Sequence, residues 1–137
     1  MKKHLVFFAL LLIFTLVLSA CSSGGGKVAE EGEMEEVPAQ YAGKTNPLGP
    51  DAAAQGQEVY TTYCASCHGD TGLGDGPAAA SLDPAPANLQ ELAATADDDF
   101  LFWRISEGVS GTAMVPWKGT LSEEQIWQVI SFLHTLK

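Results

Sequence analysis

The amino-acid sequence predicts an all-α fold from residue 51 to the C-terminus at residue 137. Three stretches in this range carry helix signals, and none shows the strict apolar and polar alternation of a half-buried strand. Asn-Gly pairs, the strongest hairpin signal, do not occur. A range this short forms one small domain, whose core often needs a covalent or metal staple.

The first two helices are marked by their ends. One is expected to start with Asp51 as its N-cap and to continue to about Tyr63. The next starts at the acidic run 97–99, because carboxylates stabilise a helix N-terminus, and ends at Gly108. Residues 69–88 between them are rich in Gly, Pro and Ala, which pack poorly alone. We therefore expect another group to fill part of the core.

The last helix has the clearest signals. Ser122 and Gln125 form a capping box, in which each side chain accepts a hydrogen bond from the backbone of the other residue. Leu121 precedes the cap and can pack against the first apolar residue of the helix. Apolar side chains then recur at the i, i+3, i+4, i+7 spacing of one helix face: Ile126, Val129, Ile130 and Leu133.

The N-terminus has the features of a bacterial export leader. Two lysines precede an apolar run from Leu5 to Leu18, which as a helix is about 21 Å long and shorter than the ~30 Å hydrocarbon core. The sequence Leu-Ser-Ala-Cys that follows resembles the lipobox of bacterial lipoproteins. The resemblance implies that residues 1–20 are removed and that Cys21 carries lipid on the extracytoplasmic face of a membrane. An ordinary signal peptide and an uncleaved anchor are the alternatives.

Residues 21–50 have the composition of an acidic, flexible linker, with Gly, Pro and Glu and few large apolar side chains. The alternative is that residues 40–50 lie extended against a partner, because Tyr41, Pro47 and Leu48 are more than a solvated spacer needs. Loss of the two leader lysines takes the formal net charge from −10 to −12. Such a charge excludes nucleic acid as a partner.

The motif Cys64-Ala-Ser-Cys67-His68 carries the chemistry of the chain. A disulfide between the cysteines would close a very short loop and leave His68 unexplained. A zinc site would have only His134 and scattered carboxylates to complete it, and a thioredoxin-like dithiol lacks its βαβ context. Attachment of one c-type haem uses every residue, because the thiols add to the haem vinyl groups and the histidine binds the iron.

The second face of the iron is assigned to Met114. The mature chain also offers Met34, in the acidic linker, and His134, near the end of the last helix. Met114 lies in SGTAMVPWKG, a glycine-flanked and proline-stiffened loop that can hold a thioether against iron without helical packing. His134 is expected to be an ordinary surface histidine. His68 and Met114 are therefore the predicted metal ligands.

From residue 51 to residue 137 the chain resembles a class I cytochrome c. The features that match are Gly56, Tyr60, the haem motif 64–68, Gly76-Pro77, Met114 and Trp127. The resemblance implies a small helical domain wrapped around one haem, with Gly56, Tyr60 and Trp127 where the first and last helices cross. It also implies that Pro77 offers its carbonyl to the ring N–H of His68, which makes the imidazole a better donor.

The same resemblance places Arg104 near a haem propionate, which an arginine can hold through two hydrogen bonds. The alternative is a surface arginine close to the acidic run 97–99 or to Glu107. One departure from the family is visible, because its Met-Pro is Met114-Val115-Pro116 in this chain. That difference concerns the loop path more than the ligation.

An iron closed on both faces has no position for a substrate, so we predict one-electron transfer rather than catalysis. The segments TNPL, CHGDTGLGDGPAAASLDPAPANL and GTAMVPW, on a lipoprotein, also resemble the monohaem cytochrome subunit of alternative complex III, a quinol-oxidising membrane complex. This implies a place in a respiratory or photosynthetic chain, with other subunits or redox proteins as partners. The alternatives are a free-standing lipid-anchored shuttle, a haem enzyme or gas sensor from which Met114 dissociates, and a structural module of a complex.

The charge of the domain limits how it can dock. Residues 51–137 carry 12 acidic residues against Arg104, Lys118 and Lys137. Such a domain docks either on a basic patch, with electrostatic steering, or through an apolar rim inside a permanent complex. The lipid and the short tether favour the second route.

Overall fold

The computed structural model describes residues 34–137. The predicted leader, residues 1–20, and the predicted lipid attachment at Cys21 lie outside the described residues. Among the helices that are described, none is long and apolar enough to cross a bilayer.

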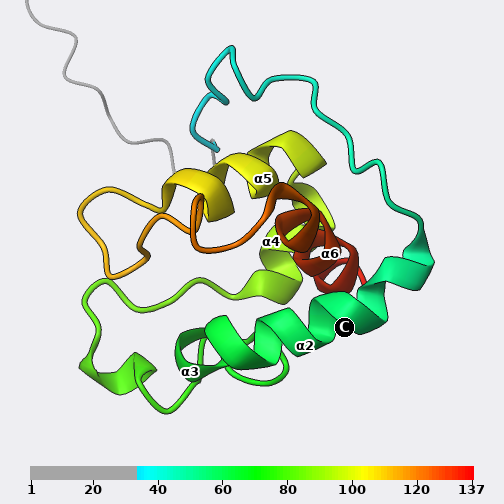
Figure 1. Cartoon of the computed structure of the whole chain (residues 1–137). Helices are drawn as coiled ribbons and strands as arrows, with labels where there is room; N and C mark the ends of the chain where they lie inside the picture. The colour runs from blue at the N-terminus through cyan, green and yellow to red at the C-terminus, as the bar shows by residue number, and fades with distance from the viewer. Residues whose placement is uncertain (1–33) are drawn as a thin grey trace, which may run out of the picture. The chain divides into compact units, whose positions relative to one another are not determined.

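Residues 34–137 form a small all-helical domain, which confirms the predicted fold class (Figure 1). Extended pairing in this part of the chain is limited to a single bridge between Lys118 and Leu121. The elements are η1 Pro50–Ala52, α2 Ala53–Tyr63, α3 Ala65–His68, η2 Ala79–Ser81, α4 Leu89–Thr95, α5 Asp98–Glu107 and α6 Glu123–Leu133.

The helix ends follow the local signals with two exceptions. The Ser122 capping box of α6 is formed, and α5 ends at Gly108, whose φ of 69° is in the left-handed region that glycine tolerates. Asp51, in contrast, caps nothing, because the chain enters α2 through the turn η1. Helix α4 was not predicted, and Asn88 caps it by accepting hydrogen bonds from the backbone N–H groups of Gln90 and Glu91.

The close crossing of α2 and α6 forms the centre of the fold. A Cβ atom on Gly56 would lie 1.9 Å from the carbonyl oxygen of Gln128, so only glycine allows the two backbones to approach this closely. One turn further along α2, the Tyr60 ring packs against Phe132 with 5.0 Å between ring centroids. The predicted roles of Gly56 and Tyr60 at the crossing are thereby confirmed.

The ring partner of Trp127 is on α5, and its predicted role at the crossing of α2 and α6 stays a prediction. Its ring stacks on Phe102 of α5, with centroids 4.2 Å apart and an interplanar angle of 26°. The α6 ring at the crossing is Phe132, which lies five residues further along the helix. Trp127 therefore joins α6 to α5.

Residues 34–50, called the strap from here on, lie against the helices (cyan in Figure 1). Tyr41 is 5% exposed and belongs to the hydrophobic core, and Leu48 packs against that core. Asn46 ties the strap to α6, because its side-chain amide donates to the Trp127 carbonyl at 3.0 Å. The unit that contains the helices begins at Met34, so it includes residues that precede residue 51, the predicted start of the cytochrome domain.

Candidate functional site

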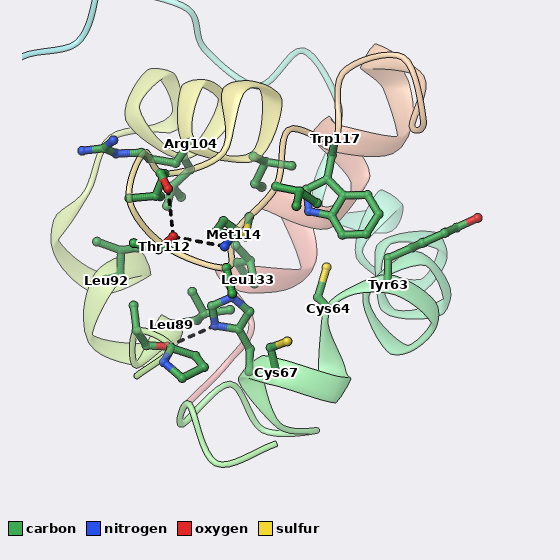
Figure 2. A pocket seen from close by; sticks show the side chains of 18 of the residues that line it. Tyr63, Cys64, Cys67, Leu89, Leu92, Arg104, Thr112, Met114, Trp117 and Leu133 are labelled. Carbon is green, nitrogen blue, oxygen red and sulfur yellow. Dashed lines mark hydrogen bonds between the residues drawn. The ribbon is translucent and has the colours of Figure 1, made fainter. Parts of the chain in front are cut away.

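A cavity of about 400 Å³ is lined by residues of the five described α-helices and of the loops that join them, and its volume is within the range of roughly 300–1,000 Å³ that is usual for small-molecule and cofactor sites. Most of its wall is apolar. Figure 2 shows Cys64 and Cys67 on one side of this space, with Met114 and Trp117 on the loop that closes it. The apolar wall includes Leu82, Leu89, Leu92, Phe100, Leu101, Ile105, Val109, Val129 and Leu133.

Both cysteines of the motif are free thiols that line this cavity. Cys64 ends α2, and the short helix α3 then turns the chain so that Cys67 and His68 face the same space. Burial, and to a lesser degree the neighbouring Cys67, raises the pKa of the Cys64 thiol to about 12. Within residues 34–137 no three His, Cys, Asp or Glu side chains are grouped so that they could hold a metal ion, so a complete set of zinc ligands is not assembled there.

The ring of His68 is held by a backbone carbonyl. Its Nδ1 lies 3.1 Å from the carbonyl oxygen of Ala87, and because a carbonyl only accepts, Nδ1 must carry the proton. This leaves the lone pair of Nε2 for a metal. Burial lowers the pKa of His68, and the hydrogen bond to Ala87 raises it by a smaller amount, so the neutral ring is favoured.

The predicted role of Pro77 as acceptor for His68 is wrong. Pro77 is exposed and does not line the cavity. The turn at Gly76 folds back on α3 instead, where the Gly76 N–H donates to the Cys67 carbonyl at 3.2 Å. The later loop, with Pro84 and Pro86, lines the cavity and brings the carbonyl of Ala87 to the ring.

Met114 lies in a non-helical loop that packs directly on the end of α5. A Cβ on Gly108 would be 2.4 Å from the Met114 carbonyl oxygen, so glycine is required for this approach as well as for its φ of 69°. The Met114 carbonyl accepts from the Val109 N–H at 3.0 Å, and its own N–H donates to Thr112 Oγ1 at 3.0 Å (Figure 2). The predicted donors Cys64, Cys67, His68 and Met114 thus all line one cavity.

Arg104 also lines the cavity and is the one Lys, Arg, Asp or Glu among the described lining residues. Neither the acidic run 97–99 nor Glu107, the neighbours expected for a surface arginine, pairs with Arg104. Its Nη2 donates to Glu35 Oε2 of the strap at 2.6 Å. Its Cζ lies over the Trp103 ring, 4.0 Å from the ring centroid. The arginine side chain is 18% exposed, and Figure 2 shows it pointing away from the two cysteines.

His134 lies outside the cavity. Its Nε2 is 2.8 Å from Asp98 Oδ1 at the start of α5, and its side chain is 41% exposed. This is the surface position that was expected. Ala87 and Thr112, which bond to His68 and Met114, were not predicted from the sequence, because they act through a carbonyl and a hydroxyl in loops without periodic signals.

The side chains present fit a covalently bound haem. Two thiols are available for the vinyl groups, one imidazole nitrogen and one thioether are available for the iron, and the wall is apolar enough to exclude water. A redox dithiol would need neither the methionine nor a cavity of this size. The donor set therefore favours haem over a zinc site, a disulfide or a redox dithiol.

Comparison with known proteins gives a family match and several similar structures. Residues 51–133 match the family model of cytochrome c oxidase, cbb3-type, subunit III. A chain of the reducing HAO-like protein complex of Kuenenia stuttgartiensis is 25% identical with a TM-score of 0.56, over 66% of this chain and 46% of that chain. This protein therefore spans less than half the length of that chain.

Cytochrome cL from Methylophaga aminisulfidivorans is 20% identical with a TM-score of 0.52, over 80% of this chain and 71% of that one. At this identity the likeness concerns the fold alone. It agrees with the helical architecture described above.

Proposed function

This chain belongs to the family of cytochrome c oxidase, cbb3-type, subunit III, a family of cytochrome c domains, and from this premise we propose its ligands, anchor and partners. The domain is a monohaem c-type cytochrome that transfers electrons. We propose that Cys64 and Cys67 would hold the haem covalently and that His68 and Met114 would bind its iron. The observation that carries this assignment is that all four side chains line one apolar cavity.

Each ligand has a separate task. When bound, haem c supplies one iron that accepts and releases a single electron. His68 keeps its Nε2 lone pair available because Nδ1 donates to the Ala87 carbonyl, and this bond fixes the ring orientation. Met114 closes the other face, and histidine–methionine ligation favours a raised potential. With both faces closed, the chain is an electron carrier rather than an enzyme.

An optical experiment tests the ligation. The oxidised full-length protein should show the weak near-infrared charge-transfer band of a sulfur-ligated haem, and the reduced protein should not bind carbon monoxide readily at neutral pH. Rapid carbon monoxide binding without any such band would instead favour a haem enzyme or gas sensor with an open distal face. Haem staining after denaturing electrophoresis checks the covalent attachment.

The second part of the proposal concerns the membrane. Lipid on Cys21 would hold the domain at the extracytoplasmic face, on the periplasmic side or the cell surface, through the residues that precede the strap. Support comes from the lipobox-like Leu-Ser-Ala-Cys sequence. Cys21→Ser should yield unlipidated precursor, and a wild-type mature N-terminus elsewhere, found by mass spectrometry, would contradict lipidation.

The third part concerns the partner, which we assign to another subunit of a quinol-oxidising membrane complex. The rim of the cavity supports this assignment, because Tyr63 is 39% exposed, Val115 is 54% exposed, and no acidic side chain is among the described lining residues. The rest of the domain is strongly acidic. An apolar rim fits a permanent neighbour better than a basic shuttle partner, which would be steered by charge.

The two routes differ in their salt dependence, because the Debye length shrinks from about 10 Å at 0.1 M to about 3 Å at 1 M salt. The rate of reduction through a permanent apolar contact should change little between 0.1 M and about 1 M salt. Second-order reduction by a soluble basic protein that slows steeply with salt would make this chain a mobile shuttle.

A further inference from the structure

The loop that carries Met114 is closed by a group of hydrogen bonds centred on one hydroxyl. Thr112 Oγ1 donates to the Val109 carbonyl at 2.9 Å and accepts from the Met114 N–H at 3.0 Å. The Thr112 N–H donates to the same Val109 carbonyl at 3.2 Å, and the Val109 N–H donates to the Met114 carbonyl at 3.0 Å. Both backbone polar groups of Met114 are therefore used, one of them by the threonine side chain.

We propose that Thr112 is a positioning residue that fixes the backbone of Met114 and so favours the arrangement in which the thioether faces the cavity. This inference rests on the ligand role of Met114 proposed above. It adds a residue that does not touch the iron. Figure 2 shows Thr112 between its two bonding partners, at the edge of the cavity that it also lines.

The chemistry of the position requires a group that donates and accepts at once. A threonine or serine hydroxyl does both, whereas valine has the shape of threonine and does neither. Met114 itself is not part of a helix, because α5 ends at Glu107 and α6 starts at Glu123. Without the hydroxyl, the Met114 N–H loses its partner in the loop and the segment can move away from the cavity.

The chain contains a matched control in Thr135. Its Oγ1 and its N–H both donate to the Phe132 carbonyl, at 2.6 and 2.8 Å, as those of Thr112 do to Val109. Thr135 does not line the cavity and has no bond to a proposed ligand. Thr135→Val therefore removes the same hydroxyl-to-carbonyl bond without changing the methionine loop.

The test is the affinity of the oxidised holoprotein for imidazole, which competes with Met114 for the iron and is followed by loss of the near-infrared band. A typical net hydrogen bond corresponds to about threefold to tenfold in an equilibrium constant. Thr112→Val should bind imidazole tighter by that factor. Thr112→Ser should stay close to wild type because it keeps the hydroxyl, and Thr135→Val should not change.

Thr112→Ala serves as a second hydroxyl deletion if valine crowds the loop. Wild-type imidazole affinity in Thr112→Val and Thr112→Ala would overturn the proposal. Equal tightening of imidazole binding in Thr112→Ser would also overturn it, because serine keeps the hydroxyl and lacks only the methyl group of threonine. A wild-type protein without the near-infrared band would refute Met114 ligation itself. That outcome is visible before any variant is made.

Discussion

The α2–α6 crossing and the loop 109–117 both bring two segments into close contact, but by different means. At the crossing, Gly56 lets one helix backbone reach the other, and the Tyr60 and Phe132 rings pack beside it. In the loop, a small number of hydrogen bonds between neighbouring residues sets the path. Each such bond contributes only about 0.5–1.5 kcal/mol, whereas fully burying one large apolar side chain contributes about 1.5–3 kcal/mol.

The difference indicates that stability and ligand position are held by separate parts of this domain. A change at the crossing should lower the stability of the whole fold, because the apolar contacts there are shared by two helices. A change in the loop should move a ligand while the helices stay folded. Substitutions in each region can test this separation.

The largest effect on stability is expected for Gly56→Ala. The new Cβ would lie 1.9 Å from the Gln128 carbonyl oxygen, so the helices must separate. Overpacking of this kind should lower the free energy of unfolding by about 3 kcal/mol, measured by urea unfolding. Gly49→Ala is the control, since a Cβ there meets nothing within 4 Å and should change stability by less than about 0.5 kcal/mol. Equal stability of the two variants would contradict the close crossing.

Met114→Ala should remove the near-infrared band completely while covalent haem and far-ultraviolet helix signal remain. The reason is that Met114 sits in a loop outside all helices, so its side chain contributes to ligation more than to folding. Met34→Ala is a matched control, because Met34 is 44% exposed in the strap. Loss of helix signal in Met114→Ala comparable to that of Gly56→Ala would show that loop and crossing are not separate.

The crossing was largely predictable from the sequence, because its features depend on side-chain type and spacing. The Ser122 capping box, the apolar face of α6 and the pair Gly56 and Tyr60 all behave as expected. The ring partner of Trp127 could not be predicted, because a helix face alone does not say which helix it meets. The two faces of α6 pack on different helices, and Trp127 lies on the one toward Phe102.

The loops were predictable in part. The residue types of the motif and of Met114 indicated the donors, since thiols, imidazole and thioether are chemically distinctive. The acceptor for His68 was not predictable, because a carbonyl belongs to every residue and only the loop path selects Ala87 over Pro77. The polar composition of the strap predicts a linker, but in the structure Tyr41 and Asn46 bind it to the helices.

A smaller effect is expected where the strap meets α5. Tyr41 donates a hydrogen bond to Glu107, and this bond, with burial and the negative charge of Glu107, raises the pKa of Tyr41 to about 12. Tyr41→Phe should cost about 1–2 kcal/mol at neutral pH, measured by urea unfolding. Tyr63→Phe, at an exposed ring, is the control and should have little effect.

The pH dependence of this difference has a defined sign. An unfolded tyrosine titrates near pH 10, so the folded state holds the Tyr41 proton more tightly. The stability from Tyr41 is therefore complete below pH 10 and is lost as the pH rises toward about 12. The difference in free energy of unfolding between wild type and Tyr41→Phe should become smaller as the pH rises from 10 to about 12. A difference that stays constant would rule out the Tyr41–Glu107 bond as its source.

The smallest effect is expected at the ion pair that joins the strap to the cavity. Glu35 is 66% exposed, so its bond to Arg104 should contribute no more than about 1 kcal/mol to stability. The charges of the pair can still act on the haem potential, because Arg104 lines the cavity and Glu35 is bonded to it. Removing the positive charge favours the oxidised form, so Arg104→Gln should lower the potential, whereas Glu35→Gln should raise it.

A redox titration of the holoprotein measures both shifts, and the double variant should fall between the single ones. Glu36→Gln provides the control, since it removes an equal charge from the neighbouring exposed residue and leaves the Glu35–Arg104 pair intact. High salt should shrink the shift of Glu35→Gln, because that carboxylate is exposed. A potential that stays unchanged in Arg104→Gln would assign this arginine to fastening the strap alone, and the strap would then be independent of the haem.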